Sequence, residues 1–88
     1  MTSEPSLIEY PSDFPIKVFG HSREDFMQAV IDVISRHDPE FKASAIESRN
    51  SKTARYISLT CTVSAVSREQ LDAIYQDLTD HPLVKMAL

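Results

Sequence analysis

The amino-acid sequence predicts an α+β fold whose elements follow in the order β-α-β-β-α-β. The chain has 88 residues, which is the length of one domain with one core. Four segments carry apolar residues at alternate positions, and two segments carry them at helical spacing. We expect residues 1–12 to form a partly disordered tail or arm, and residues 13–88 to form a single domain.

The first half of the chain predicts a strand, a helix and a weaker strand. Residues 14–20 alternate in polarity and end at a glycine. Ser22 is an N-cap candidate, and Asp25 stands where it can return the capping interaction. The helix that follows is expected to stop before the pair at 38–39, because a residue that precedes proline is pushed out of the α region. The weaker strand is expected at 41–49.

The second half repeats the pattern with clearer signals. Residues 56–63 alternate strictly between apolar and hydroxylated side chains, which is typical of a strand with one buried face. Ser67 begins a second capping box with Gln70, and an amphipathic helix follows up to residue 80. In the last strand, 83–88, one face is expected to carry Val84, Met86 and Leu88, and the other Lys85. Two helices on one face of a four-stranded antiparallel sheet form the ferredoxin-like two-layer sandwich.

The scarcity of glycine and cysteine excludes several classes of site. A single glycine excludes the phosphate-binding loops that need two or more. A single cysteine, Cys61, excludes an internal disulfide and a metal site built on paired thiolates. The three histidines lack the close spacing of metal ligands. We therefore expect no cofactor and no metal.

Net charge and hydropathy limit the partners. Thirteen acidic residues against nine basic ones give a formal charge of −4, which argues against nucleic acid because phosphate neutralisation requires excess Lys and Arg. The N-terminal residues carry no signal-peptide pattern, and no apolar run has the length of a membrane span. The expectation is a cytoplasmic protein with no membrane partner.

Several segments together resemble the YbeD-like family of small bacterial proteins. They are residues 7–11, 14–20, 51–52, 56–60 and 84–88. The resemblance implies a ferredoxin-like fold close to the ACT regulatory domains, without an assigned activity, and its members often lie near genes of lipoate synthesis. ACT domains bind amino acids through a glycine-containing turn after the first strand, and Gly20 is the residue that matches this position.

One end of the predicted fold gathers three connections and the start of the first helix. Helix N-termini and basic side chains favour anions, so a carboxylate or phosphate is a candidate ligand there. The candidate anion-binding residues are Gly20, His21, Ser22, Lys52 and Arg55. In the alternative interpretation, the hairpin expected at residues 49–55 is charged only because it is exposed to solvent.

The open face of the sheet is the second candidate site. Its expected residues are Lys17, Phe19, Tyr56, Ser58, Thr60, Thr62 and Lys85. Such a face can pack against a protein partner, a second copy of the chain or the arm at residues 7–10. Edge-strand addition through the weak second strand is a further route. Alternatively the face is simply hydrated, which antiparallel sheets tolerate.

These observations lead to one functional hypothesis and two alternatives. The hypothesis is a non-enzymatic binding or regulatory module that acts through protein association and senses a small anionic metabolite. The first alternative is an acylphosphatase-like hydrolase that uses Arg23 and Asn50. The second is a weak binder of single-stranded RNA, in which Tyr56 and Phe19 stack on bases.

Overall fold

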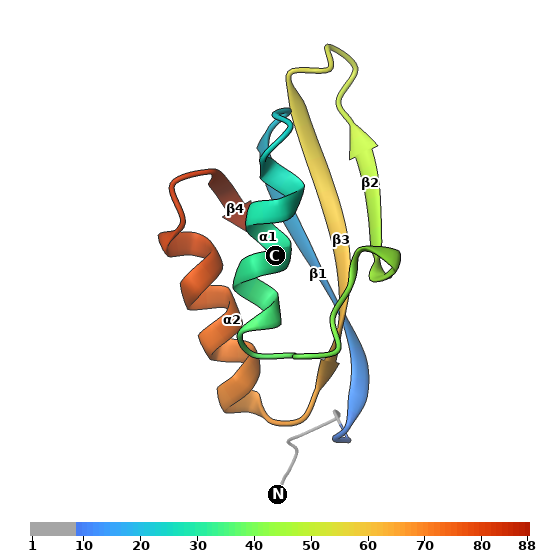
Figure 1. Cartoon of the computed structure of the whole chain (residues 1–88), viewed down its shortest axis with the longest axis vertical. Coiled ribbons are helices and arrows are strands. Elements are labelled where there is room, and N and C mark those ends of the chain that lie inside the picture. The colour runs from blue at the N-terminus through green and yellow to red at the C-terminus, as the bar shows by residue number, and fades with distance from the viewer. Residues whose placement is uncertain (1–8) are drawn as a thin grey trace, which may run out of the picture.

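The computed structural model describes residues 9–88, so most of the predicted N-terminal arm lies outside the described residues. The elements follow in the predicted order (Figure 1). They are β1 (Ser12–His21), α1 (Phe26–Ser35), the 3₁₀ turn η1 (Ala43–Ala45), β2 (Ile46–Asn50), β3 (Tyr56–Ala65), α2 (Arg68–Asp80) and β4 (Val84–Ala87). The predicted ferredoxin-like fold is confirmed.

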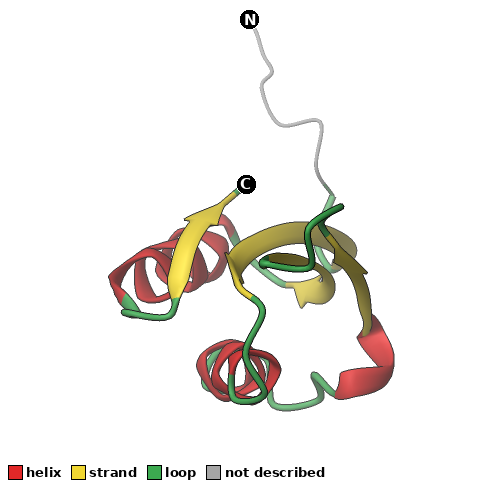
Figure 2. Ribbon diagram, turned by 90° about the horizontal axis from the view of Figure 1, so that it is seen from above, coloured by secondary structure: helices red, strands yellow, loops and turns green. Residues whose placement is uncertain are grey.

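The four strands form one antiparallel sheet in the order β2-β3-β1-β4. The two longest strands, β1 and β3, lie at its centre and pair along ten residues. Both helices pack on the same face of the sheet, as the end-on view shows (Figure 2). The other face carries no helix from the described residues.

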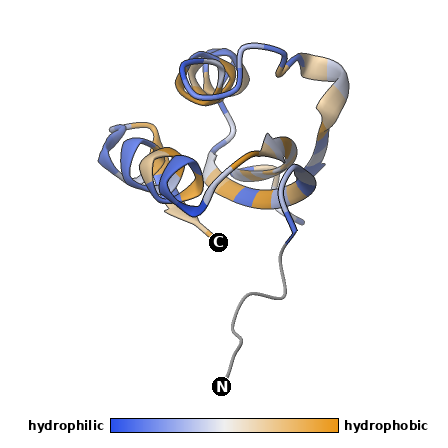
Figure 3. Cartoon of the chain, turned by 90° about the horizontal axis from the view of Figure 1, so that it is seen from below, coloured by the Kyte–Doolittle hydropathy of each residue, from blue (hydrophilic) through white to orange (hydrophobic). Residues whose placement is uncertain are grey.

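The core lies between the sheet and the two helices. The helices and central strands around it include the hydrophobic residues coloured orange in Figure 3. The alternation predicted for β3 is confirmed, because Leu59, Cys61 and Val63 are fully buried. From β1, Ile16 and Val18 are buried beside them. The helices contribute the fully or almost fully buried residues Phe26, Val30, Val33, Ile34, Ile74 and Leu78.

The start of α1 differs from the prediction. The helix begins at Phe26, with Asp25 at the N-cap position, and Ser22 is not its cap. The reason is that backbone pairing continues one residue beyond β1: the backbone N–H of Ser22 donates to the carbonyl of Arg55, the residue before β3, at 2.8 Å. The carboxylate of Asp25 accepts hydrogen bonds from Arg23 instead of capping the helix.

The predicted cap of α2 is confirmed. The backbone N–H of Gln70 donates to the hydroxyl of Ser67 at 3.0 Å. The side chain of Gln70 departs from the capping box, because its oxygen accepts from the N–H of Val66 at 2.7 Å. Its amide nitrogen donates to the carbonyls of His37, at 2.9 Å, and Ser64, at 3.2 Å. This one residue therefore joins the segment after α1 to the end of β3.

The second strand is shorter than predicted. It begins at Ile46 rather than at residue 41, because the η1 turn occupies the preceding three residues. Phe41 retains the apolar role that suggested a strand, since its side chain is buried against the core from the loop. All five residues of β2 pair in continuous register with β3.

The faces of the last strand also differ from the prediction. The pairing of β1 with β4 shifts register between Phe19 and Gly20, which is a β-bulge. Val84 and Ala87 both pack against the core, while Met86 is opposite Phe19 and exposed. An extra residue in one strand changes which side chains face inward, so strict alternation over 83–88 assigned the faces wrongly.

Candidate functional site

The open face of the sheet carries side chains from all four strands. Residues directly opposite one another in antiparallel strands point to the same face. One row across the sheet contains Glu47, Thr60 and Lys17. The next row contains Arg49, Ser58, Phe19 and Met86. The sheet therefore brings basic, acidic, hydroxylated and apolar groups onto one surface.

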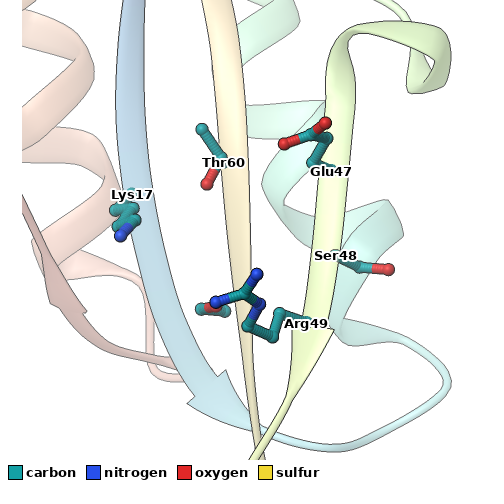
Figure 4. A pocket seen from close by; sticks show the side chains of 6 residues that line it. Lys17, Glu47, Ser48, Arg49 and Thr60 are labelled. Atoms are coloured by element: carbon teal, nitrogen blue, oxygen red, sulfur yellow. The ribbon is translucent and has the colours of Figure 1, made fainter.

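A groove of about 460 Å³ crosses this face between β1 and β2. It is lined by Lys17, Glu47, Ser48, Arg49, Ser58 and Thr60. The side chain of Arg49 lies toward β3, whereas that of Ser48 points away from β3 (Figure 4). Two cations and several hydroxyls around one carboxylate can hydrogen-bond a polar or anionic group.

Apolar side chains border the groove on the β1 and β4 side. Met86 is 48% exposed and Leu88 is 62% exposed, and Phe19 is half-buried beside them. The backbone of Leu88 exchanges two hydrogen bonds with that of Lys17, at 2.9 and 2.7 Å, which places it next to the groove. Tyr56 is 44% exposed on the same face. Three of the five exposed large hydrophobic residues in the described part of the chain therefore lie here.

Tyr56 has an aromatic neighbour across the strand pair. It is opposite His21, and the two ring centroids are 5.0 Å apart with planes inclined at 30°. One side of the tyrosine ring is therefore in contact with imidazole. This contact reduces the ring surface on which a nucleic-acid base would stack in the RNA-binding alternative.

The structure places six of the seven residues predicted for the interaction surface on the open face. The seventh, Lys85, lies at the bulge and is exposed. The sequence analysis does not assign Glu47 and Arg49 to this face. Their positions two residues apart place them on one side of β2, but this follows only when the start of the strand is known. The sequence also predicts that Met86 and Leu88 share a face with Val84. Because of the bulge, Val84 packs on the core whereas Met86 and Leu88 lie on the open face. That a partner uses this face stays a prediction.

Of the predicted anion-binding residues, Gly20 is buried and belongs to the core packing. A Cβ atom at this position would lie 2.7 Å from the carbonyl oxygen of Leu83 and would also collide with the ring of Phe26. The glycine thus allows α1 and the α2–β4 connection to approach β1. Its backbone leaves no open space on the helix side for a ligand.

The other anion-binding candidates lie at the end of the sheet that carries the three connections, as expected (Figure 1). His21, Ser22, Lys52 and Arg55 are all exposed there. The start of α1, however, already carries a carboxylate: Asp25 accepts two hydrogen bonds from Arg23, at 2.9 and 3.0 Å. These bonds hold the pKa of Asp25 below its ordinary value. An anion at this end stays a prediction.

Of the two residues named for the hydrolase alternative, Asn50 is exposed at the end of β2, and Arg23 is engaged in an ion pair. The guanidinium of Arg23 is bonded to Asp25. Cys61 is buried in the core, and burial raises the pKa of its thiol to about 12, which disfavours a nucleophilic thiolate. Residues 9–88 contain no group of three or more His, Cys, Asp or Glu side chains arranged to hold a metal ion.

None of the helices in the described segment is both long and apolar enough to cross a membrane.

Comparison with solved structures supports the fold. The solution structure of protein HP0495 from H. pylori superposes with a TM-score of 0.74 and covers 98% of this chain and 90% of its own. The two sequences are 16% identical, so this likeness concerns the fold alone.

Sequence comparison identifies much nearer relatives. The chain is 50% identical over 86 residues to the UPF0250 protein NE1487 of Nitrosomonas europaea, covering 98% of this chain and 99% of the relative. It is 57% identical over 83 residues to a UPF0250 protein of Janthinobacterium, covering 94% and 91%. A family model described as "Protein of unknown function (DUF493)" matches residues 5–88. The chain therefore belongs to the DUF493 family, the YbeD-like group of small bacterial proteins that its sequence resembles.

Proposed function

We propose that the protein is a non-enzymatic binding module that associates with another protein through the open face of its sheet. The observation that carries this proposal is a sheet face, covered by neither of the described helices, on which Tyr56, Met86 and Leu88 are exposed. Exposed apolar groups gathered on one face of a small domain are typical of interaction sites. Tyrosine is also among the residues that most often anchor interfaces.

The charges of the face indicate the chemistry of the partner. The chain as a whole has a formal charge of −4, yet Lys17 and Arg49 extend into the groove against a single carboxylate, Glu47. Complementary charge steers association and excludes wrong partners. The partner we propose presents carboxylates next to apolar side chains. Its carboxylates would bind Lys17 and Arg49 in the groove, and its apolar side chains would pack against Met86 and Leu88.

A small anionic ligand is a second candidate partner. The groove is a better binding site for it than the hairpin end of the sheet. In the groove, Lys17 and Arg49 supply cations and Ser58 and Thr60 supply hydroxyls. At the hairpin end, Gly20 is covered and Asp25 occupies the start of α1. Titration with inorganic phosphate and with acetate, followed by backbone amide shifts, distinguishes the sites: shifts at Arg49 support the groove, and shifts confined to Lys52 and Arg55 refute it.

The proposal of a non-enzymatic role is supported by the state of the reactive groups. The thiol of Cys61 is buried, and Arg23 is bonded to Asp25. The description of the family names no reaction. Hydrolysis of an acyl phosphate that is abolished by Arg23→Ala would overturn this part of the proposal.

Affinity capture with matched charge reversals tests the association. The bait is the full chain, as wild type, as Lys17→Glu and as Arg68→Glu. Both residues are exposed, but Arg68 begins α2 on the helical side. We expect a protein that the wild type and Arg68→Glu capture and that Lys17→Glu loses. A set of captured proteins unchanged by Lys17→Glu contradicts the proposal, and capture of RNA in place of protein would replace it with the RNA-binding alternative.

A further inference from the structure

The two edges of the sheet are built differently. At one edge, β4 has four residues, contains Lys85 and is interrupted by the bulge. Short strands, lysines and bulges are devices by which proteins prevent pairing at a sheet edge. At the other edge, β2 pairs regularly with β3 through five residues and contains no proline, lysine or bulge. The edge formed by β2 is therefore open to pairing.

The hydrogen-bond pattern shows which groups of β2 are directed outward. The backbone N–H of Ser51 donates to the carbonyl of Tyr56 at 2.9 Å, immediately beyond the end of β2. Hydrogen-bonded and non-hydrogen-bonded pairs alternate along an antiparallel ladder. Arg49 and Glu47 therefore bond to β3, and the backbone groups of the intervening residues point away from the sheet. The outward-directed residues are Ile46, Ser48 and Asn50.

We propose that a second copy of this chain pairs with β2 in antiparallel fashion, with the two-fold axis at Ser48. In this register Ser48 of each copy is opposite Ser48 of the other, and both use their outward-directed N–H and C=O groups. The pairing creates one continuous eight-stranded sheet. Because paired residues point to the same side, the open faces of both copies lie side by side on one surface.

The side chains of β2 select this register and this occupant. A two-fold axis at Ser48 places Glu47 of each copy opposite Arg49 of the other, in a non-hydrogen-bonded pair where side chains approach most closely. An axis at Glu47 or at Arg49 would place like charges opposite each other, which is destabilising. The segment Glu47-Ser48-Arg49 is thus complementary to its own antiparallel copy.

The contact is small, so the expected dimer is weak and depends on concentration. Interfaces below the standard size are typical of transient association, and the energy here comes from a few backbone hydrogen bonds and two exposed ion pairs. The inference concerns the edge of the sheet and does not rest on the partner proposed for its face. A dimer would nevertheless present two grooves on the same surface.

Charge reversal tests the proposal with a designed rescue. Sedimentation equilibrium from low micromolar to millimolar concentration is compared for the wild type, Glu47→Arg, Arg49→Glu and an equimolar mixture of the two variants. We expect the wild type to dimerise and each variant alone to be monomeric, because each places like charges opposite each other twice. The mixture should form a heterodimer, since one variant carries two arginines at these positions and the other carries two glutamates.

Two further variants make the outcome specific. Arg68→Glu reverses an exposed charge at the start of α2, away from the β2 edge, and it should dimerise like the wild type. The double variant Glu47→Arg/Arg49→Glu restores self-complementarity and should dimerise, with circular dichroism confirming that every variant is folded. A monomeric wild type at millimolar concentration, or a dimer that survives Glu47→Arg, would overturn the proposal. So would a mixture of the two folded variants that stays monomeric.

Discussion

The carboxylate of Asp38 accepts a hydrogen bond from the backbone N–H of Ser64 at 3.0 Å, although the two residues are 26 positions apart. Asp38 is 6% exposed and follows the last turn of α1. It also accepts from the N–H of Glu40 at 3.3 Å. The sequence predicts only that Asp38 ends a helix. In the structure, Asp38 also connects the α1–β2 loop to the end of β3 by a hydrogen bond.

Asp38→Ala should destabilise the protein because it leaves the N–H of Ser64 without this acceptor. Removal of a buried acceptor costs about 1–3 kcal/mol in the free energy of unfolding. The control is Asp32→Ala, whose carboxylate is exposed and accepts from Gln28 on the same helix; it should change stability by less than about 0.5 kcal/mol. Urea unfolding of both variants measures the difference, and equal losses would contradict the role assigned to Asp38.

The two serines that the sequence suggests as helix caps should respond differently to substitution. Ser67→Ala removes the acceptor of the Gln70 N–H and should cost about 1 kcal/mol. Ser22→Ala should cost less than about 0.5 kcal/mol, because only the backbone of this residue is bonded. Thermal unfolding of both variants makes the comparison. A larger loss for Ser22→Ala would mean that α1 begins where the sequence alone suggests.

The buried thiol of Cys61 should make the protein less stable at alkaline pH. Burial raises its pKa from the ordinary 9.0 to about 12, so between these values the folded state keeps a proton that the unfolded state has lost. Stability therefore decreases as pH rises through this range, by up to about 1.4 kcal/mol per pH unit. Denaturant unfolding at pH values from neutral to alkaline measures the slope.

Cys61→Val is the control for this slope because it keeps an apolar side chain and removes the titrating group. Burial also raises the pKa of Tyr75, which contributes in the same direction in both proteins. The difference between the two curves therefore belongs to Cys61. A thiol reagent should react with the folded wild type only at the rate of unfolding, and rapid reaction would show that the thiol is accessible.

The parts of the fold that the sequence predicts correctly depend on local rules. The alternation of β3 follows from burial of one face, and the cap of α2 follows from Ser67 and Gln70 within one turn. These signals need no knowledge of the rest of the chain. The same locality explains why the tertiary bonds of Gln70 could not be foreseen, since nothing near it indicates that it contacts His37.

The errors arise where a distant strand decides the local structure. Serine is a favoured N-cap residue, but the N–H of Ser22 is bonded to the carbonyl of Arg55 just before β3. The helix α1 therefore begins later in the sequence, at Phe26. Met86 lies on the open face because β4 bulges opposite Phe19 and Gly20. For the candidate site, the sequence located the residues of β1 and β3, whereas the contributions of β2 and β4 required their register.

The long-range polar bonds of Asp38, His37 and Gln70 have a further consequence for how the molecule fluctuates. They lie at the end where α1 and β3 finish and α2 begins, and His37 adds a 2.7 Å contact with Asp77. The opposite end holds the 51–55 hairpin, whose side-chain bonds are made within residues 51–56. Local opening should therefore begin at the hairpin. A ligand bound there would have to order the hairpin, whereas one in the groove contacts residues that are already paired within the sheet.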